Sequence, residues 1–309
     1  MLVAVAAAAI AVLVGVRAGY RVLDVDEAVY IRTLRGMQHG DGYYGAMRAS
    51  LIVKEHAPPR SLRAIRPPTE FLFMRLFPEK SWRYIAGIAF LASLMACRRL
   101  AQPASEIVVA AGVLLAGVWM IAASPTLFLH AEIYGLPFFL FGLRSFKDGK
   151  EHGAAWMIAG ATVMRELFGL GLLLGFVFGK RRRAWIAPTA VVVALFAVHV
   201  VLTHRILSSS GFETALGNGK INARFILSAL SPGDTASAWL FGIGGLLAGG
   251  TVLIRRRAEP LSRLLIAFAI LMIPAMILAT RTYWSYTFAP AFAALAPGAL
   301  IARDFENAS

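Results

Sequence analysis

Long apolar segments recur along the whole chain, and they limit its possible folds more than any other feature. Hydrophobic residues make up 58% of the 309 positions, above the share that soluble domains use. A segment of about 20 apolar residues is long enough to cross a bilayer as a helix. The sequence therefore predicts an all-α polytopic membrane protein. We expect spans at about residues 2–19, 83–97, 106–123, 132–143, 184–202, 236–254, 262–279 and 286–301.

The first of these segments, residues 2–19, resembles a signal peptide in length. Val16-Arg17-Ala18 loosely resembles a cleavage site. However, no Lys or Arg precedes the segment, and Arg17 interrupts the small-residue pattern that cleavage requires. We therefore expect the segment to remain as a membrane anchor.

The stretch 154–179 is apolar except for Arg165 and Glu166 at its middle. A single straight helix would place both charges near the bilayer centre, at a cost of about 2.5–3.5 kcal/mol each. A helical hairpin avoids this cost. Each arm would have about twelve residues, or roughly 18 Å of helix. The tip would then stop within the protein at membrane depth, where Arg165 and Glu166 line a cavity.

The distribution of basic residues predicts the orientation of the chain. The net charge is +14, but the cations lie mainly between apolar segments, so we expect contacts with membrane lipids and no nucleic-acid partner. With the hairpin, the basic residues of the short loops share one side, which the positive-inside rule assigns to the cytoplasm. These stretches are Arg98–Arg99, Arg144–Lys150, Lys180–Arg183 and Arg255–Arg257.

This topology predicts a single transmembrane domain over residues 1–309 of the plasma (inner) membrane. The chain would make about ten apolar passes, with both termini in the cytoplasm. A first external loop would extend over about residues 20–82. Every cluster of polar residues considered below then lies on the external face.

The first external loop begins with a run that has helical spacing. Tyr30, Leu34 and Met37 share one face beside Ile31, and Gly40 and Gly42 end the pattern. This pattern predicts an amphipathic helix that lies in the membrane interface.

The acidic start of this helix, Asp24, Asp26 and Glu27, has two interpretations. Asp24 as the N-cap and Glu27 as the N3 residue would form an arrangement like a capping box. That structural role explains Asp24 and Glu27 more naturally than Asp26. Alternatively, the carboxylates serve chemistry at the membrane surface.

Further polar residues of the external loops are candidate ligands. The segment from Lys54 to Glu70 combines cations and possible ligands and has the charge to bind a phosphate, although a solvated loop is the commoner meaning of such residues. His56 and His130, the latter two residues before Glu132, are possible metal ligands. Their spacing is not diagnostic, and it favours a structural role.

Several of these residues together resemble a known family, the GT-C class of integral-membrane glycosyltransferases. The resemblance is greatest to the branch with protein O-mannosyltransferases and aminoarabinose transferases. It rests on Asp26-Glu27-Ala-Val-Tyr30, followed by Arg35 and Gly40-Asp41-Gly42-Tyr43. This pattern is similar to the family's acidic pair, Tyr and Gly-Tyr end of the first juxtamembrane helix. Arg66-Pro67-Pro68 resembles the basic-Pro-Pro step that follows, and the hairpin with Arg165-Glu166 resembles another common feature.

The resemblance implies an inverting glycosyltransferase that moves a sugar from a polyprenyl-phosphate or polyprenyl-pyrophosphate carrier. The acceptor would be a hydroxyl of a glycan, lipid or protein at the external face. The attacking hydroxyl needs a carboxylate to take its proton, and the departing phosphate needs positive charge. Asp26 is the candidate base. Candidates to stabilise the phosphate are Lys54, Arg63, Arg66, Arg165 and Arg281.

Glu27 or Glu132 would assist through hydrogen bonds or through a divalent metal cation, which some relatives need and others do not. No other cofactor is expected. The chain has fewer spans than many members of the family, and we expect no external domain after the last span.

A second hypothesis is a non-catalytic protein that binds or translocates polyprenyl lipids. Translocation needs a polar path through the bilayer, and hence charges deep in several spans. Here the charges gather at one face, which favours surface chemistry.

Overall fold

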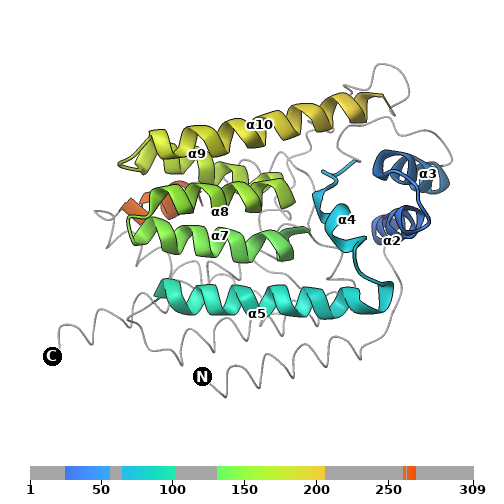
Figure 1. Cartoon of the computed structure of the whole chain (residues 1–309), viewed down its shortest axis with the longest axis horizontal. Coiled ribbons are helices and arrows are strands. Elements are labelled where there is room, and N and C mark those ends of the chain that lie inside the picture. Colours follow the sequence, from blue (N-terminus) through green and yellow to red (C-terminus); the bar gives the residue numbers. More distant parts are fainter. Residues whose placement is uncertain (1–24, 56–64, 102–130, 206–259, 262, 269–309) are drawn as a thin grey trace, which may run out of the picture.

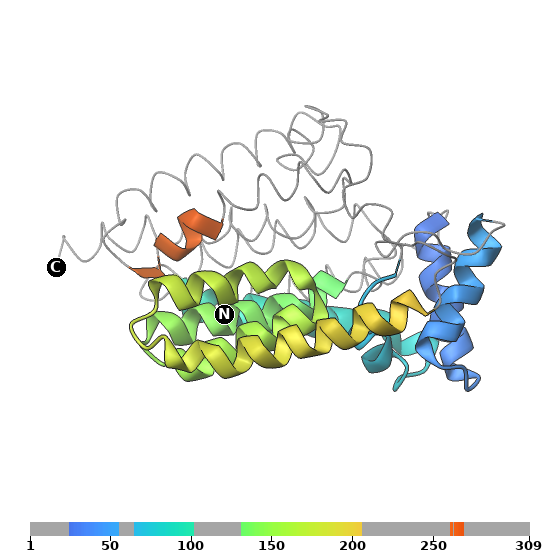
Figure 2. The same ribbon diagram turned by 90° about the horizontal axis from the view of Figure 1, so that it is seen from above.

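The computed structural model describes residues 25–55, 65–101, 131–205, 260–261 and 263–268. All regular elements in these ranges are helical, which confirms the all-α class. Helices α5, α7, α8, α9 and α10 run side by side as a bundle, and α2 and α3 lie across one end of it (Figures 1 and 2). The helices are α2 (Val25–Gln38), α3 (Tyr43–Glu55), α4 (Thr69–Met74), η2 (Glu79–Ser81), α5 (Trp82–Ala101), α7 (Ala131–Lys147), α8 (Glu151–Met164), η4 (Glu166–Phe168), α9 (Gly169–Phe178) and α10 (Arg183–His204).

Close packing of α7 on α8 forms the centre of the bundle. A Cβ added to Gly142 would lie 2.6 Å from Cγ1 of Ile158 and 3.2 Å from the carbonyl oxygen of Ala154. Gly135 lies seven residues before Gly142 on the same face of α7. A Cβ added there would lie 3.1 Å from the carbonyl oxygen of Ala161. Small residues at these positions let the two helix backbones approach closely, as is common between helices in membranes.

The chain reverses direction between α8 and α9. Arg165 has an extended backbone (φ −147°, ψ 120°), which ends α8, and the short helix η4 then leads into α9. The reversal lies at Arg165 and Glu166, where the charge argument expects a hairpin tip. At about 1.5 Å per residue, both arms are shorter than α10, which extends further toward α2 and α3 (Figure 1).

A buried carboxylate holds the other end of the hairpin. Glu151, at the start of α8, accepts hydrogen bonds from the backbone N–H groups of Lys180 (2.8 Å) and Arg181 (3.0 Å) and from Nε1 of Trp185 (3.1 Å). The link between α9 and α10 is thereby fixed to the start of α8. Nearby, Nη1 of Arg144 donates to the carbonyl oxygen of Arg99 and joins α7 to α5.

These contacts gather basic residues at the end of the bundle away from α2 and α3 (Figure 1). Three of the four basic stretches that the sequence analysis groups together lie there: Arg98–Arg99, Arg144–Lys150 and Lys180–Arg183. The fourth, Arg255–Arg257, lies outside the described residues. The short links between these helices are therefore basic at this end of the described bundle.

Among the described helices, one is long and apolar enough to cross a membrane, namely α10. Only 22% of its most apolar window is buried within the protein, whereas a core helix of a soluble protein is mostly buried. Val193, Val198 and Val201 are each more than half exposed on its surface. Helices α5 and α7, at the expected spans 83–97 and 132–143, do not meet this criterion. The expected spans at 2–19, 106–123, 236–254 and 286–301, and most of the one at 262–279, lie outside the described residues, so the number of passes stays a prediction.

Helix α2 has the apolar stripe that the sequence predicts, but this stripe packs within the protein. Tyr30, Ile31, Leu34 and Met37 are all buried, in a cluster with residues of α3 and α4. Neighbouring helices cover this face of α2, and the position of the helix at the membrane interface stays a prediction. Gly40 ends the helical segment with φ +107°, a conformation that glycine adopts without strain.

Candidate functional site

Two of the predicted phosphate-binding cations, Arg66 and Arg165, lie at the end of the bundle that α2 and α3 cross (Figure 1). Arg66 precedes α4, and Arg165 lies at the hairpin tip. The structure describes the helical backbone of Asp26, Glu27 and Glu132, but not their side chains. Asp24, Arg63, Arg281 and the weak metal candidates His56 and His130 lie outside the described residues.

Arg66 is held by contacts with three helices. Its guanidinium carbon lies 4.3 Å from the ring centroid of Tyr30 on α2, within the range of a cation–π interaction. Its Nη1 lies 4.0 Å from Oε2 of Glu70, in the first turn of α4. The hydroxyl of Tyr43, at the start of α3, donates to the backbone carbonyl of Arg66. The positive charge is therefore fixed where the three helices meet.

The surroundings of Arg66 are largely apolar and aromatic. Phe71 contacts the rings of both Tyr30 (centroids 5.7 Å apart) and Tyr43 (5.2 Å). Burial raises the pKa of Tyr43 well above its ordinary value, and the charge of Glu70 raises it further. Tyr43 thus remains a neutral hydrogen-bond donor across the ordinary pH range, and Glu70 is a buried carboxylate with Arg66 as its ion-pair partner.

Asp26 and the Arg66 contact are both on α2. Asp26 precedes Tyr30 by four residues, so the two positions lie on one side of the helix, about 6 Å apart along its axis. Arg66 lies over the ring of Tyr30, and the predicted base therefore comes about one helical turn before the residue that Arg66 contacts.

Arg165 pairs with its neighbour Glu166 at the hairpin tip. Its Nη1 lies 3.4 Å from Oε1 of Glu166, and the Arg165 side chain is 9% exposed. On α10, the ring of His199 hydrogen-bonds the backbone of Ile65. Ile65 immediately precedes Arg66, so this hydrogen bond joins α10 to the Arg66 segment.

His199 also joins α10 to α3. Its Nδ1 lies 2.9 Å from the hydroxyl of Tyr44, and the two rings stack with centroids 5.9 Å apart. The hydroxyl of Thr203, one turn further along α10, lies 3.5 Å from the same nitrogen. These contacts hold the transverse helices against the end of the bundle.

Glu70 lies in the candidate segment from Lys54 to Glu70, but two features of the site are not predicted from the sequence: its ion pair with Arg66 and the contacts of His199. A signal existed for each of them. Glu70 follows Arg66 by four residues at the start of a helix, a spacing at which ion pairs form. His199 is a polar residue inside the apolar stretch 184–202, and such residues usually have a specific partner.

Lys54 lies apart from this cluster. It is in the last turn of α3, whereas Tyr43, which contacts Arg66, is in the first. Eleven residues of helix separate the two by about 16 Å along the axis. Within the part of the chain that the structure describes, no group of three or more His, Cys, Asp or Glu side chains is arranged to hold a metal ion.

No family model, curated protein or solved structure matches the chain. The resemblance to GT-C glycosyltransferases therefore depends on the residues quoted in the sequence analysis. The positions and charges of Arg66 and Arg165 are independent evidence about function, because they do not rely on that resemblance.

Proposed function

We propose that the protein is a multi-pass glycosyltransferase of the plasma (inner) membrane that resembles the GT-C class. It would transfer a sugar from a polyprenyl-phosphate or polyprenyl-pyrophosphate carrier to an acceptor hydroxyl at the external face. One observation carries the proposal: Arg66 and Arg165 are held at the same end of the bundle, and Arg66 lies over Tyr30 of the helix that contains Asp26.

The exposed apolar surface of α10 and the distribution of basic residues along the bundle both support a position in the membrane. Helix α10 exposes large apolar side chains over most of its length, which is costly in water and favourable in lipid. The basic residues of three short loops share the end of the bundle opposite the Arg66 cluster. By the positive-inside rule that end is cytoplasmic, and the Arg66 cluster is external.

The proposed reaction needs a base, a cation for the leaving group and an inverted anomeric centre. The acceptor oxygen attacks the anomeric carbon as Asp26 takes its proton, and the bond from that carbon to the phosphate oxygen breaks. The electron pair leaves with the lipid phosphate, whose charge Arg66 and Arg165 would stabilise. Single-step displacement inverts the anomeric centre. Glu27, Glu132, Lys54, Arg63 and Arg281 remain candidates to hold the substrates.

Arg165 is buried and Arg66 is half-buried, and this partial exclusion of water supports a phosphate role. Charged hydrogen bonds from guanidinium to phosphate are strong, and their strength grows as water is excluded. Glu70 and Tyr30 fix the position of Arg66, and Glu166 lies beside Arg165. Because these contacts already hold the two guanidinium groups in place, the protein has less to rearrange when the phosphate leaves, and this lowers the activation free energy.

The test is incubation of the purified protein with labelled polyprenyl-linked sugars and native membrane extract, followed by mass spectrometry of the products. We expect transfer of the label to an acceptor and release of the lipid phosphate. If the protein binds a carrier but forms no product with any sugar and extract, the non-catalytic lipid-binding hypothesis replaces the proposal.

Donor binding tests the role of Arg165 separately. Arg165→Met removes the charge but keeps an unbranched side chain, and should weaken binding of the polyprenyl-linked donor by roughly ten-fold or more, as loss of a charged hydrogen bond does. Arg75→Met, at an exposed position after α4, is the matched control. Unchanged donor affinity in folded Arg165→Met protein would remove this residue from the site.

A further inference from the structure

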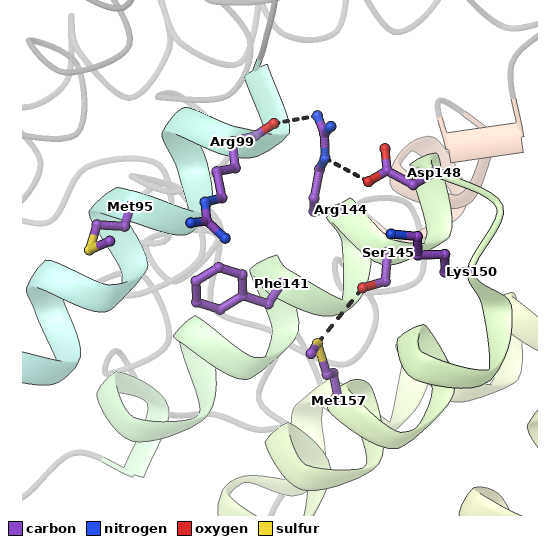
Figure 3. Close-up of a pocket in the computed structure, with 8 residues that line it drawn as sticks. All are labelled: Met95, Arg99, Phe141, Arg144, Ser145, Asp148, Lys150 and Met157. Atoms are coloured by element: carbon purple, nitrogen blue, oxygen red, sulfur yellow. Dashed lines mark hydrogen bonds and ion pairs between the residues drawn. The ribbon is translucent and has the colours of Figure 1, made fainter.

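A polar cavity lies at the basic end of the bundle, and neither Arg66 nor Arg165 lines it. Figure 3 shows the residues of its wall. It has a volume of about 570 Å³ and opens between α5, α7 and the start of α8. Its wall combines cations with apolar side chains. The lining residues are Met95, Arg99, Phe141, Arg144, Ser145, Asp148, Lys150 and Met157.

The charge of this wall is positive. Nε of Arg144 donates to Oδ2 of Asp148 at 3.0 Å, so this pair is neutral overall. Arg99 and Lys150 are both exposed, and neither side chain has an ion-pair or hydrogen-bond partner among the described residues. The guanidinium of Arg99 lies beside the ring of Phe141 (Figure 3). Two positive charges are therefore available to an anion in the cavity.

The apolar part of the wall continues along α5. Met95 lines the cavity and is 56% exposed, and Ile88, seven residues earlier on the same face, is 65% exposed. Tyr84, one turn before Ile88, is also exposed. The cavity thus leads from a cationic end to an apolar strip on the bundle surface. This is the order in which a phospholipid presents its phosphate and its acyl chains.

We propose that this cavity binds the phosphate headgroup of an anionic phospholipid from the surrounding bilayer. Arg99 and Lys150 contact the phosphate, and the acyl chains follow the strip from Met95 to Ile88. Basic pockets between membrane helices on the cytoplasmic side bind anionic headgroups in this manner. The cavity also exceeds the size of a free phosphate and falls in the range of sites for larger ligands. This site is separate from the one proposed for sugar transfer.

Native mass spectrometry of the full chain in an uncharged detergent tests the proposal. The probes are phosphatidylglycerol and phosphatidylcholine with the same acyl chains, and inorganic phosphate. We expect phosphatidylglycerol to bind more tightly than phosphatidylcholine. Arg99→Gln and Lys150→Gln should each weaken it by about five-fold, the contribution of one cation near an anionic lipid surface.

Arg182→Gln is the matched control, because Arg182 is exposed at the same end of the bundle but does not line the cavity. Equal binding of the two lipids, or an equal loss in Arg182→Gln, would overturn the proposal in favour of diffuse surface attraction. Displacement of phosphatidylglycerol by millimolar inorganic phosphate would overturn it in favour of a soluble anion. Arg99→Lys, which keeps the charge, should retain most of the affinity. None of these outcomes depends on sugar transfer, so either proposal can fail alone.

Discussion

Asp26 is the residue on which the proposed chemistry depends most. Asp26→Asn keeps the size and much of the hydrogen bonding of the side chain but removes its negative charge. If Asp26 is the general base, the product formation rate at saturating donor should fall by about 10²- to 10⁴-fold while the protein stays folded. The rate of transfer by purified protein measures this directly.

Asp24→Asn is the matched control for Asp26→Asn. Asn caps helices about as well as Asp, so this variant should lose little stability or activity if Asp24 is only the N-cap. An inactive Asp24→Asn beside a fully active Asp26→Asn would identify Asp24 as the base. If both variants turn over like the parent, no carboxylate of this pair is the base.

For single residues, charge and motif in the sequence predict which side chains belong to the site, but they do not predict which other side chains they contact. Arg66 and Arg165 stand out because a cation before two prolines and a cation inside an apolar stretch are both unusual. Their surroundings do not follow from spacing. Tyr44 and His199 are 155 positions apart and meet only because α3 crosses the end of α10. Burial of Glu70 likewise depends on α2 and α3 covering α4.

Among the helices, the contact between α7 and α8 makes a specific prediction. Gly142→Ala places a methyl group 2.6 Å from Cγ1 of the fully buried Ile158 and 3.2 Å from the backbone carbonyl oxygen of Ala154. Overpacking of this kind costs about 1–3 kcal/mol. Thermal unfolding in detergent, followed by tryptophan fluorescence, should therefore show a lower Tm for Gly142→Ala.

Gly153→Ala provides the control in the partner helix α8. A Cβ there meets no other atom within 4 Å, and Ala favours a helix over Gly by up to about 1 kcal/mol. The two glycine variants should thus shift the Tm in opposite directions. A Gly142→Ala protein as stable as Gly153→Ala would show that the two helices do not approach closely at this point.

Glu151 predicts a second effect at the level of helices. Its two carboxylate oxygens accept three N–H groups from the start of α10 and the link before it. Glu151→Gln replaces one acceptor oxygen with an NH₂ group that cannot accept, which leaves at least one buried donor unsatisfied. We expect a loss of about 2–3 kcal/mol in the free energy of unfolding.

The neighbouring substitution His152→Gln should change stability little, because His152 is exposed. Chemical unfolding of both variants in the same detergent makes the comparison. If Glu151→Gln and His152→Gln have the same free energy of unfolding, the hydrogen bonds of Glu151 do not stabilise the packing of the hairpin against α10.

Apolar length predicts some helices well and others not at all. The stretches 83–97, 132–143 and 184–202 fall within α5, α7 and α10, because predominantly apolar segments of this length leave few alternatives to a helix in a membrane-like composition. Helix α3 has no such signal. Its buried residues Ala46, Met47 and Leu51 face α2, and a stripe this short, which includes one alanine, cannot be distinguished from a loop by periodicity alone.

At the scale of the whole molecule, the two ends of the bundle differ in charge and in construction. One end carries the basic links between helices and the cavity lined by Arg99 and Lys150. The other carries the transverse helices and the cluster around Arg66. Sequence patterns predict this division, because the positive-inside rule sorts the short loops before any packing is known. Which surfaces the transverse helices cover could not be predicted, since that depends on contacts between distant segments.

The two ends should lie on opposite sides of the membrane, with the basic end in the cytoplasm. Single cysteines at Arg182 and Asp41, introduced in a Cys97→Ser background, test this arrangement. Both positions are exposed, Arg182 before α10 and Asp41 in the turn between α2 and α3. An impermeant maleimide should label Cys at position 41 on intact cells, and Cys at position 182 only after permeabilisation. Labelling of position 182 alone from outside would invert the orientation. Labelling of both from outside would show that the bundle does not separate the two ends across the bilayer, and the external site for sugar transfer would lose its basis.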